Sequence, residues 1–200
     1  MPKEDWIENT VQRIFEREGL YPTGKIRTVL DVGCGLSLKS QYIDADVRVG
    51  VDIYRPFLEK IEADAPYAVV NADALEIGNL FLPRSFDLVL LLDILEHMQK
   101  KDALRVMDMA EQIARVAVIA ESPKGYVPQN IDIWGHGGHI YQTHRCSWEP
   151  EEFAARGYHV LLRDYTMSDV KRHTEMDADP HIVLIDAIRR FDLVDEKESK

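Results

Sequence analysis

One stretch of this 200-residue chain decides the fold: Val29-Leu30-Asp31-Val32-Gly33-Cys34-Gly35. The residues from Arg27 to Val32 are mostly apolar or β-branched and predict a buried strand. Two glycines follow, so the backbone can turn tightly and a ligand can approach the main chain without a Cβ in the way. In sheets of parallel strands, ligands bind at the carboxyl ends of the strands. The stretch therefore predicts a ligand-binding turn.

Strands and helices alternate around this turn through the first 120 residues. Such alternation predicts a parallel sheet whose strands are joined by right-handed crossovers. The segment Phe86 to Leu92 is nearly all apolar, which is typical of a central strand covered on both faces. The expected elements are an amphipathic helix at 4–18, strands at 27–32, 46–51, 67–70, 86–92 and 116–120, and helices at 56–63 and 102–114.

The pattern changes after residue 120. Residues 121–147 are rich in Gly, Pro, His and aromatic residues and show no period, and a segment of that length without regular structure is more often functional than not. A helix at 149–156 and strands at 158–165 and 181–188 are expected beyond it. Two consecutive strands with no helix between them, only the polar segment 168–180, predict an antiparallel hairpin at the sheet edge. The acidic tail, residues 191–200, is expected to be flexible.

Composition narrows the classes of partner. The net charge of −11, without a cluster of Lys and Arg, argues against nucleic acid, because proteins that bind it usually present a basic face. The longest apolar run, residues 88–92, is too short to cross a membrane, and the first residues lack the apolar core of a signal peptide. Cys34 and Cys146 have no metal-binding or redox spacing. We expect a reduced, cytoplasmic protein with neither nucleic acid nor membrane as partner; its oligomeric state is left open.

Charge around the turn indicates which nucleotide it holds. The dinucleotide fingerprint is Gly-x-Gly-x-x-Gly, but Gly33 and Gly35 are followed by Leu-Ser-Leu, so the third glycine is missing. The carboxylate of Asp31 would repel a pyrophosphate and suit a ligand that carries an ammonium and a sulfonium. Asp52, at the end of the second strand, can hydrogen-bond both ribose hydroxyls, although NAD enzymes place an acid there too.

In chain order, four elements resemble the class I S-adenosylmethionine-dependent methyltransferases, especially the small type 11-like members. They are the Asp31–Gly35 turn, Asp52, the run Asn71-Ala72-Asp73-Ala74, and Phe86-Asp87-Leu88-Val89 running into Leu92-Asp93-Ile94-Leu95-Glu96-His97. The resemblance covers about residues 27–190, with Ser37 standing where many members have a third glycine. It implies an α/β fold, a doubly wound, mostly parallel seven-stranded sheet with an antiparallel C-terminal hairpin, in one domain spanning residues 1–190.

The resemblance also implies S-adenosyl-L-methionine as the cofactor and assigns roles to residues. Asp73 would accept a hydrogen bond from the adenine amino group, the amide of Ala74 would contact the ring, and Ile53 would lie against it. His97 is expected to cap or pack beneath the site, and Asp87 to be structural. The full set of expected cofactor-binding residues is Asp31, Gly33, Gly35, Asp52, Ile53, Asp73, Ala74 and Asp93.

The segment 121–148 is expected to form the acceptor wall. Similar small methyltransferases carry a Gly-x-x-x-Gln-x-His-Arg-Ser-x-Trp-like stretch there, which Gln142, His144, Arg145, Ser147 and Trp148 match approximately. The expected acceptor-binding residues are His136, Tyr141, Arg145 and Trp148. His144, slightly ahead of His139, is the candidate general base, because an imidazole of near-neutral pKa can take a hydroxyl proton.

Other roles for this segment stay open. The histidines could simply hold the loop by hydrogen bonds and packing. Arg145 could bind an anionic group of the acceptor, or pair with Glu149 or Glu151. A metal could be bound by His136, His139 and His144, but no nearby Cys or pair of acids supports such a site, so no metal is predicted.

The predicted reaction is in-line displacement of the sulfonium methyl by a nucleophile, in which the cofactor supplies the reactivity and the protein supplies alignment and a dry pocket. The chain lacks the (Asn/Asp)-Pro-Pro-aromatic run that amino-methyltransferases carry after the fourth strand. A small molecule or a sugar hydroxyl is therefore the favoured acceptor. The alternatives are an NAD-dependent oxidoreductase and a non-catalytic cofactor-binding module with the same fold.

Overall fold

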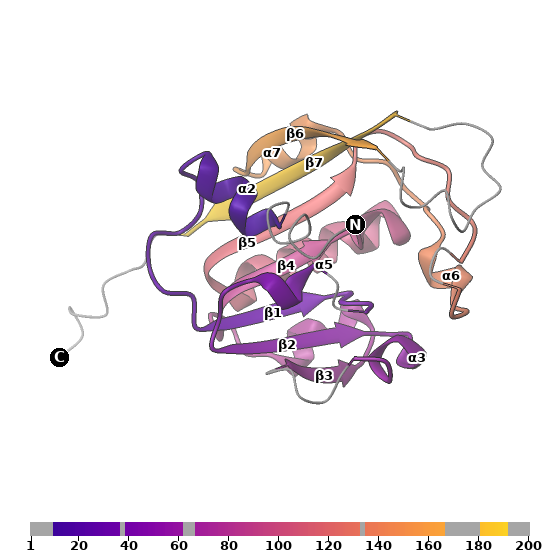
Figure 1. Ribbon diagram of the computed structural model, residues 1–200, viewed down its shortest axis with the longest axis horizontal. Helices are drawn as coiled ribbons and strands as arrows, with labels where there is room; N and C mark the ends of the chain where they lie inside the picture. The colour runs from indigo at the N-terminus through magenta and orange to yellow at the C-terminus, as the bar shows by residue number, and fades with distance from the viewer. Residues whose placement is uncertain (1–9, 37–38, 62–66, 133–134, 167–180, 192–200) are drawn as a thin grey trace.

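The computed structural model describes residues 10–36, 39–61, 67–132, 135–166 and 181–191. Its centre is one seven-stranded sheet with the strand order β3-β2-β1-β4-β5-β7-β6 (Figure 1). The first five strands in the chain are parallel, and β7 and β6 run antiparallel to their neighbours, which confirms the predicted fold class. The strands are β1 (Thr28–Val32), β2 (Val47–Asp52), β3 (Tyr67–Asn71), β4 (Phe86–Leu92), β5 (Ala114–Pro123), β6 (His159–Thr166) and β7 (His181–Arg190).

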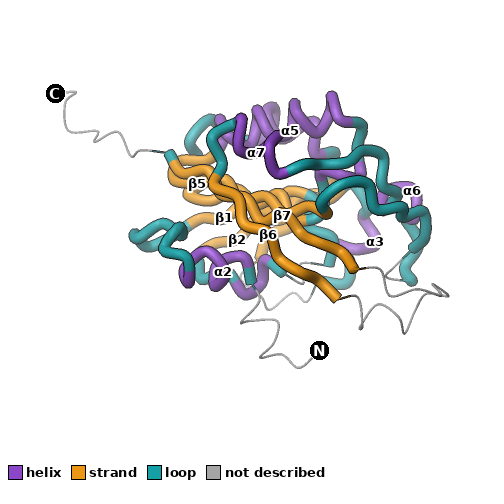
Figure 2. The backbone as a smooth tube through the Cα atoms, turned by 90° about the horizontal axis from the view of Figure 1, so that it is seen from above, coloured by secondary structure: helices purple, strands orange, loops and turns teal. Residues whose placement is uncertain are grey.

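Helices cover both faces of the sheet (Figure 2). The face covered by α5 (Lys100–Ile113) and α7 (Pro150–Ala155) lies opposite the one covered by α2 (Val11–Arg17). The short helices are α3 (Arg55–Leu58), α4 (Ile77–Leu80) and α6 (His139–Gln142), with 3-10 turns η1 (Ser40–Tyr42), η2 (Ala74–Glu76) and η3 (Leu95–His97). Of the predicted helix at 4–18, residues 4–9 lie outside the described residues. The helix begins after Thr10, whose hydroxyl accepts from the Arg13 N–H as an N-cap.

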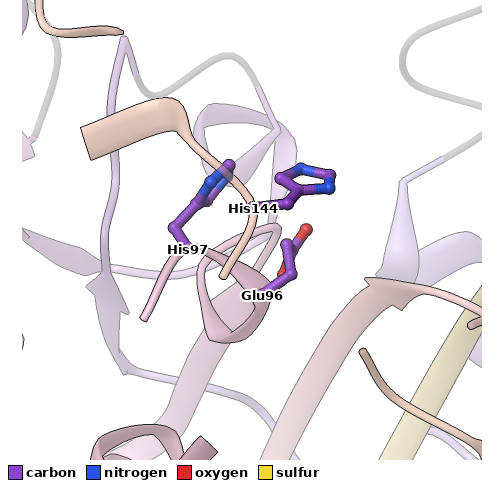
Figure 3. A group of neighbouring side chains, drawn as sticks. All are labelled: Glu96, His97 and His144. Atoms are coloured by element: carbon purple, nitrogen blue, oxygen red, sulfur yellow. The ribbon is translucent and has the colours of Figure 1, made fainter. Parts of the chain in front are cut away.

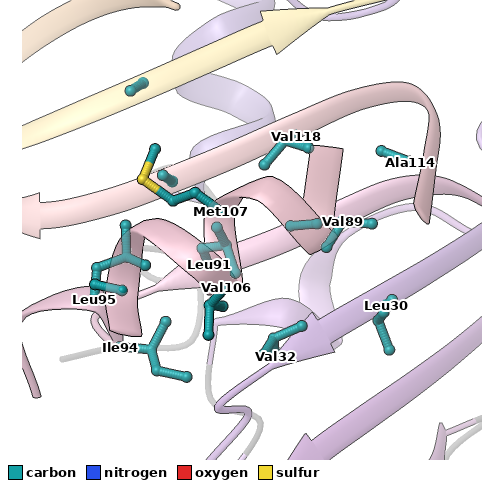
Figure 4. Close-up of a cluster of buried hydrophobic side chains, with 14 of the residues drawn as sticks. Leu30, Val32, Val89, Leu91, Ile94, Leu95, Val106, Met107, Ala114 and Val118 are labelled. Atoms are coloured by element: carbon teal, nitrogen blue, oxygen red, sulfur yellow. The ribbon is translucent and has the colours of Figure 1, made fainter. Parts of the chain in front are cut away.

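The central strands build two cores because successive side chains on a strand point to opposite faces. On β4, Leu88 and Leu90 belong to the cluster that packs on α2, whereas Val89 and Leu91 belong to the cluster that packs on α5 (Figure 4). All seven residues of β4 are buried, which explains the continuous apolar run in the sequence. Asp87 is structural, as expected, because its carboxylate accepts from the backbone N–H groups that lead into β1.

The segment expected to form the acceptor wall, residues 121–148, called the acceptor loop below, begins later than predicted. Strand β5 continues to Pro123 instead of ending at residue 120, because Glu121, Ser122 and Pro123 pair with β7. The loop therefore begins at Lys124, and it contains the short helix α6. The antiparallel pair is present, with β7 inserted between β5 and the edge strand β6. The polar segment 168–180 and the tail beyond Phe191 lie outside the described residues.

The parallel strands direct their carboxyl ends to one edge of the sheet. The chain passes from β1 outward through β2 to β3 and then returns to β4 on the other side of β1, so the strand order reverses between β1 and β4. Ligands of doubly wound sheets bind at such a reversal. Helices α3 and α6 lie at this end of the sheet (Figures 1 and 2).

Candidate active site

A cavity of about 420 Å³ lies at this reversal point. All of the expected cofactor-binding residues except Asp31 line it: Gly33, Gly35, Asp52, Ile53, Asp73, Ala74 and Asp93. Of the expected acceptor-binding residues, Tyr141 and Arg145 line it. Within the described part of the chain, His136, His139, His144 and Trp148 are not part of its wall.

The glycine turn forms the floor of the cavity. Gly33 has φ +72°, and a Cβ there would lie 2.3 Å from Cδ1 of Ile94, so only glycine fits. Its N–H donates to the carbonyl of Val51 at 2.7 Å, and this bond holds the turn against β2. Gly35 has φ +51° and donates its N–H to Oδ2 of Asp52 at 2.8 Å.

Asp52 stands where β2 ends. Its second oxygen, Oδ1, accepts from the N–H of Tyr54 at 2.7 Å, so the carboxylate is fixed between the turn and α3. Burial raises the pKa of Asp52, although these two hydrogen bonds act in the opposite direction. A carboxylate offers about four acceptor positions, so it can still accept from hydroxyl groups of a ligand in the cavity.

The end of β3 completes this side of the cavity. Asp73 caps η2, with Oδ1 accepting from the Leu75 N–H at 2.9 Å. The Asn71 amide donates to the carbonyls of Asp52 and Ile53 at 2.9 and 3.0 Å, which fixes the ends of β2 and β3 relative to one another. The Ile53 side chain is 41% exposed and gives the cavity an apolar surface.

Asp31 lies beneath the turn and is only 4% exposed. It does not line the cavity, contrary to the prediction that it binds the cofactor. It sits in the interior of a strand that pairs on both sides, where Tyr67 donates its hydroxyl to Oδ2 at 2.9 Å. Burial raises the pKa of Asp31 to about 6, against the hydrogen bonds from Ser40 and Tyr67.

Asp93 connects the cavity to the antiparallel strands. It follows β4 with a left-handed φ of +51° and pairs with Lys39, which also pairs with the buried Glu121 of β5. Arg163 of β6 then joins Glu121 to Asp186 of β7, at 2.7 and 2.8 Å. Although burial opposes it, the charges of Lys39 and Arg163 lower the pKa of Glu121 to about 2. The sequence predicted only Asp93 of this network. Glu121, Arg163 and Asp186 are charged residues within β5, β6 and β7, and Lys39 directly precedes η1.

The two candidate bases are placed differently. His144 is 8% exposed, donates its backbone N–H to the carbonyl of Gln129 at 2.9 Å, and has Nδ1 2.6 Å from the carbonyl oxygen of Val127. Burial lowers its pKa. His139 is exposed at the start of α6. The exposed His136 contributes a carbonyl that accepts from the Tyr54 hydroxyl at 3.0 Å.

Arg145 lines the cavity but pairs with neither Glu149 nor Glu151 in the described structure. Its guanidinium donates instead to the carbonyls of His97 and Ile140, and its backbone N–H donates to the carbonyl of Glu96 at 2.7 Å. These bonds hold the loop against η3. Tyr141 lies beside Tyr54, with 5.7 Å between the ring centroids.

Trp148 belongs to the core instead of the acceptor site, which corrects the prediction. It is fully buried, with its ring 5.1 Å from that of Phe153 and Nζ of Lys100 3.5 Å above its centroid. Its carbonyl accepts from the N–H of Gly125 at 2.7 Å, so it anchors the base of the loop. An aromatic residue at the end of a loop gives no sequence signal for which side it faces.

Two residues of η3, Glu96 and His97, were not among the predicted site residues. His97 lines the cavity, and its ring lies 4.8 Å from that of His144, between centroids. Burial and the neighbouring His144 lower the pKa of His97 to about 4. Glu96 is 3% exposed, and burial together with the charge of Asp93 raises its pKa well above the usual range. Their position directly after β4 was the available signal, since that strand ends at the cavity.

Comparison with known proteins agrees with this geometry. Residues 30–117 match the family model described as a methyltransferase domain. No curated protein matches the chain. In the described residues, no helix combines the length and the apolar character needed to cross a membrane.

Solved structures share the fold at low sequence identity. An S-adenosylmethionine-dependent methyltransferase from Archaeoglobus fulgidus is 19% identical, over 90% of this chain and 93% of its own, with a TM-score of 0.56. Magnesium protoporphyrin IX methyltransferase from Synechocystis PCC 6803 is 15% identical, over 93% and 79%, with a TM-score of 0.54. A small RNA methyltransferase is 16% identical, over 94% of this chain and 25% of its own, with a TM-score of 0.57. The acceptors named for the last two proteins differ in kind, so the likeness supports the fold and leaves the acceptor open.

Proposed function

We propose that this chain, which is an S-adenosylmethionine-dependent methyltransferase (EC 2.1.1.-), methylates a hydroxyl of a small molecule or sugar. The observation that carries the proposal is the charge of the cavity: four aspartates line it, Asp52, Asp73, Asp93 and Asp102, against one arginine, Arg145. This balance suits a cationic cofactor and a neutral acceptor. It disfavours an acceptor rich in phosphates, as does the net charge of −11.

The described residues fit the cofactor. When bound, S-adenosylmethionine supplies an electrophilic methyl group on a sulfonium. Asp52 would accept from the ribose hydroxyls, since its carboxylate is already fixed at the rim by two backbone N–H groups. Asp73 and Ile53 would hold the adenine, one by its carboxylate and the other by its exposed apolar surface. Asp31 beneath the turn and Asp93 in the wall would place negative charge near the ammonium and sulfonium groups.

The acceptor would enter on the side of Tyr141 and Arg145, which line the same cavity. Alignment of the nucleophile with the methyl group supplies much of the rate in such transfers, so a base is not obligatory. Neither His144 nor His139 lines the cavity, so a direct proton transfer to either is disfavoured. We therefore propose that His144 supports the wall of the cavity. We assign no role in proton transfer to His139 and His136, which are exposed on the loop.

Cofactor binding is tested by titrating S-adenosylhomocysteine into wild type and Asp52→Ala in a calorimeter. Hydrogen bonds to a charged acceptor are worth ~1.5–3 kcal/mol each, so losing two should weaken binding about 100-fold or more. The matched control is Asp46→Ala, because this exposed acid forms an ion pair with Lys25 and, in the described part of the chain, with no other residue, and it is not part of the cavity wall. Equal affinities of the two variants, or tighter binding of NAD than of S-adenosylhomocysteine, would contradict the assignment.

The acceptor is tested with radiolabelled S-adenosylmethionine against three matched pools: sugars and phenols, short RNA oligomers, and peptides. We expect label in the first pool, in products that resist mild base, as ethers do. Label only in RNA or peptide would overturn the proposed acceptor class while leaving methyl transfer intact. No label in any pool at any pH, with cofactor binding retained, would favour the non-catalytic alternative.

A further inference from the structure

A three-residue cluster lies beside the cavity where η3 meets the acceptor loop. Glu96, His97 and His144 bring one ligand atom each within 4.8 Å of one another (Figure 3). Among the described residues, neither His136 nor His139 belongs to this group, so it differs from the all-loop set that the sequence spacing allowed. We propose that Glu96, His97 and His144 bind one divalent transition-metal ion, with an open coordination position toward the cavity.

The tautomer of His144 suits a ligand. Its Nδ1 is 2.6 Å from the carbonyl oxygen of Val127, and because a carbonyl can only accept, Nδ1 carries the proton and donates. The neutral ring therefore keeps its lone pair on Nε2. Histidines that bind metals usually donate their other ring N–H to a carbonyl or carboxylate in this way, which fixes the orientation of the ring.

His97 offers a lone pair that nothing in the described structure uses. Its Nδ1 is buried and has no hydrogen-bond partner among the described residues. In the neutral tautomer that carries its proton on Nε2, the ring keeps its lone pair on this Nδ1. Leaving a buried polar atom without a partner costs ~1–3 kcal/mol, which a coordinated cation would recover.

Glu96 is a buried carboxylate without a cation. It is 3% exposed, and Oε2 accepts from the hydroxyl of Ser122 at 3.1 Å. Within the described ranges no Lys or Arg forms an ion pair with it, and the like charge of Asp93 acts on its pKa more strongly than the opposite charge of Lys39 does. Burying an ionised carboxylate without a counter-charge is costly, so a cation at this point would stabilise the folded chain.

The donor set limits the kind of metal. Two imidazole nitrogens and one carboxylate oxygen suit Zn²⁺, Fe²⁺, Co²⁺ or Ni²⁺ better than Ca²⁺ or Mg²⁺, which prefer oxygen ligands. Three protein ligands leave a position free, as in catalytic sites and unlike closed structural ones. Because His97 lines the cavity, that position faces the acceptor side. A cation there would lower the pKa of a hydroxyl that reaches it, a consequence that rests on the proposed function, whereas metal binding itself does not.

The test is a Zn²⁺ titration of the untagged chain, freed of metal with a chelator, in competition with a chromophoric chelator and without cofactor or acceptor. We expect one Zn²⁺ per chain, and binding at least tenfold weaker in His144→Ala and in Glu96→Gln, since even loss of an outer-sphere partner costs 10- to 100-fold. The matched control is His159→Ala, an exposed histidine on β6, which should bind as wild type does. Binding of Co²⁺ to wild type should give visible absorption bands of nitrogen and oxygen ligation, absent in His144→Ala.

Three results would overturn the proposal: no stoichiometric binding to wild type, binding unchanged in both cluster variants, or binding lost equally in His159→Ala. A loss in His139→Ala that matches the loss in His144→Ala would move the metal to the loop histidines instead. Binding of S-adenosylhomocysteine, measured on the same preparations, shows that each variant is folded. Since the titration contains no methyl donor, its failure would leave the proposed methyl transfer untouched.

Discussion

Substitution of Gly33 by alanine measures how strictly the turn depends on its glycine. At φ +72° an alanine costs ~1–2 kcal/mol in backbone conformation alone. Its Cβ would also lie 2.3 Å from Cδ1 and 2.8 Å from Cγ1 of Ile94, and overpacking of this kind adds ~1–3 kcal/mol. We therefore expect Gly33→Ala to lower the free energy of unfolding by ~2–5 kcal/mol, a large share of the ~5–15 kcal/mol of a typical domain.

The two contributions can be separated by shortening the neighbour. Ile94→Ala removes both of the closest atoms and leaves Cβ, which would lie 3.0 Å from the new methyl group. In that background Gly33→Ala should cost only the conformational ~1–2 kcal/mol, so the double-mutant cycle should give a coupling of ~1–3 kcal/mol. Gly35→Ala is the matched control, since Gly35 also has a positive φ, but no atom of the described residues lies within 4 Å of a Cβ placed there. Its cost should not depend on residue 94.

The assay is urea unfolding of the four proteins of the cycle and of Gly35→Ala with and without Ile94→Ala, followed by circular dichroism, with the denaturant slope m checked for constancy. Titration of S-adenosylhomocysteine reports the turn directly, and affinity should fall in the order wild type, Gly35→Ala, Gly33→Ala. An equal cost of Gly33→Ala with Ile94 present or shortened would refute the steric part of the reasoning. A cost below about 0.5 kcal/mol would refute the conformational part as well.

Three further predictions concern buried side chains. Because burial raises the pKa of Asp31 from 3.8 to about 6, the folded chain holds this proton longer than the unfolded chain, so the contribution of Asp31 to stability should fall by ~2–3 kcal/mol as pH rises from 4 to 7. Asp31→Asn should remove that fall and weaken cofactor binding, and parallel pH profiles of the two proteins would contradict this. The pKa of Glu121 is lowered from 4.5 to about 2, so its contribution to stability has the opposite pH dependence. Glu121→Gln should lower the free energy of unfolding by ~3 kcal/mol at pH 7 and by progressively less as pH falls from 4.5 to 2, measured by urea unfolding. Trp148→Ala should lower the free energy of unfolding by ~3–5 kcal/mol and leave the affinity for S-adenosylhomocysteine within about twofold. A loss of affinity without a loss of stability would instead show that Trp148 belongs to the binding site.

The sheet could be predicted because its signals are local. Strand β4 matches its predicted bounds at both ends, since a strand buried on both faces leaves one uninterrupted apolar run. The cofactor side of the cavity was predictable for a related reason. Gly33, Asp52 and Asp73 each come at or just after the end of a strand, so the topology alone brings them to one edge of the sheet.

The acceptor side could not be predicted in the same way, because its contacts join segments far apart in the chain. The sequence shows three histidines close together between residues 136 and 144, yet the structure separates His144 from the others and places it against His97. What decides this is the path of the loop, held by bonds such as the one from the His144 ring to Val127. A spacing of three or five residues in a glycine-rich loop carries no information about such a path.

Buried charge at the carboxyl ends of β4 and β5 shows an asymmetry that packing alone does not explain. Glu121 is as buried as Glu96, but Glu121 is paired with both Lys39 and Arg163, and the first of these also pairs with Asp93. Among the described residues Glu96 forms no ion pair, and its carboxylate accepts from the hydroxyl of Ser122. If Glu96 served only packing, an apolar residue would do so at less cost, because a buried carboxylate without a counter-charge is destabilising. The carboxylate of Glu96 lies beside two imidazole rings and next to the cavity. A cation that binds there explains this position better than packing of the fold does.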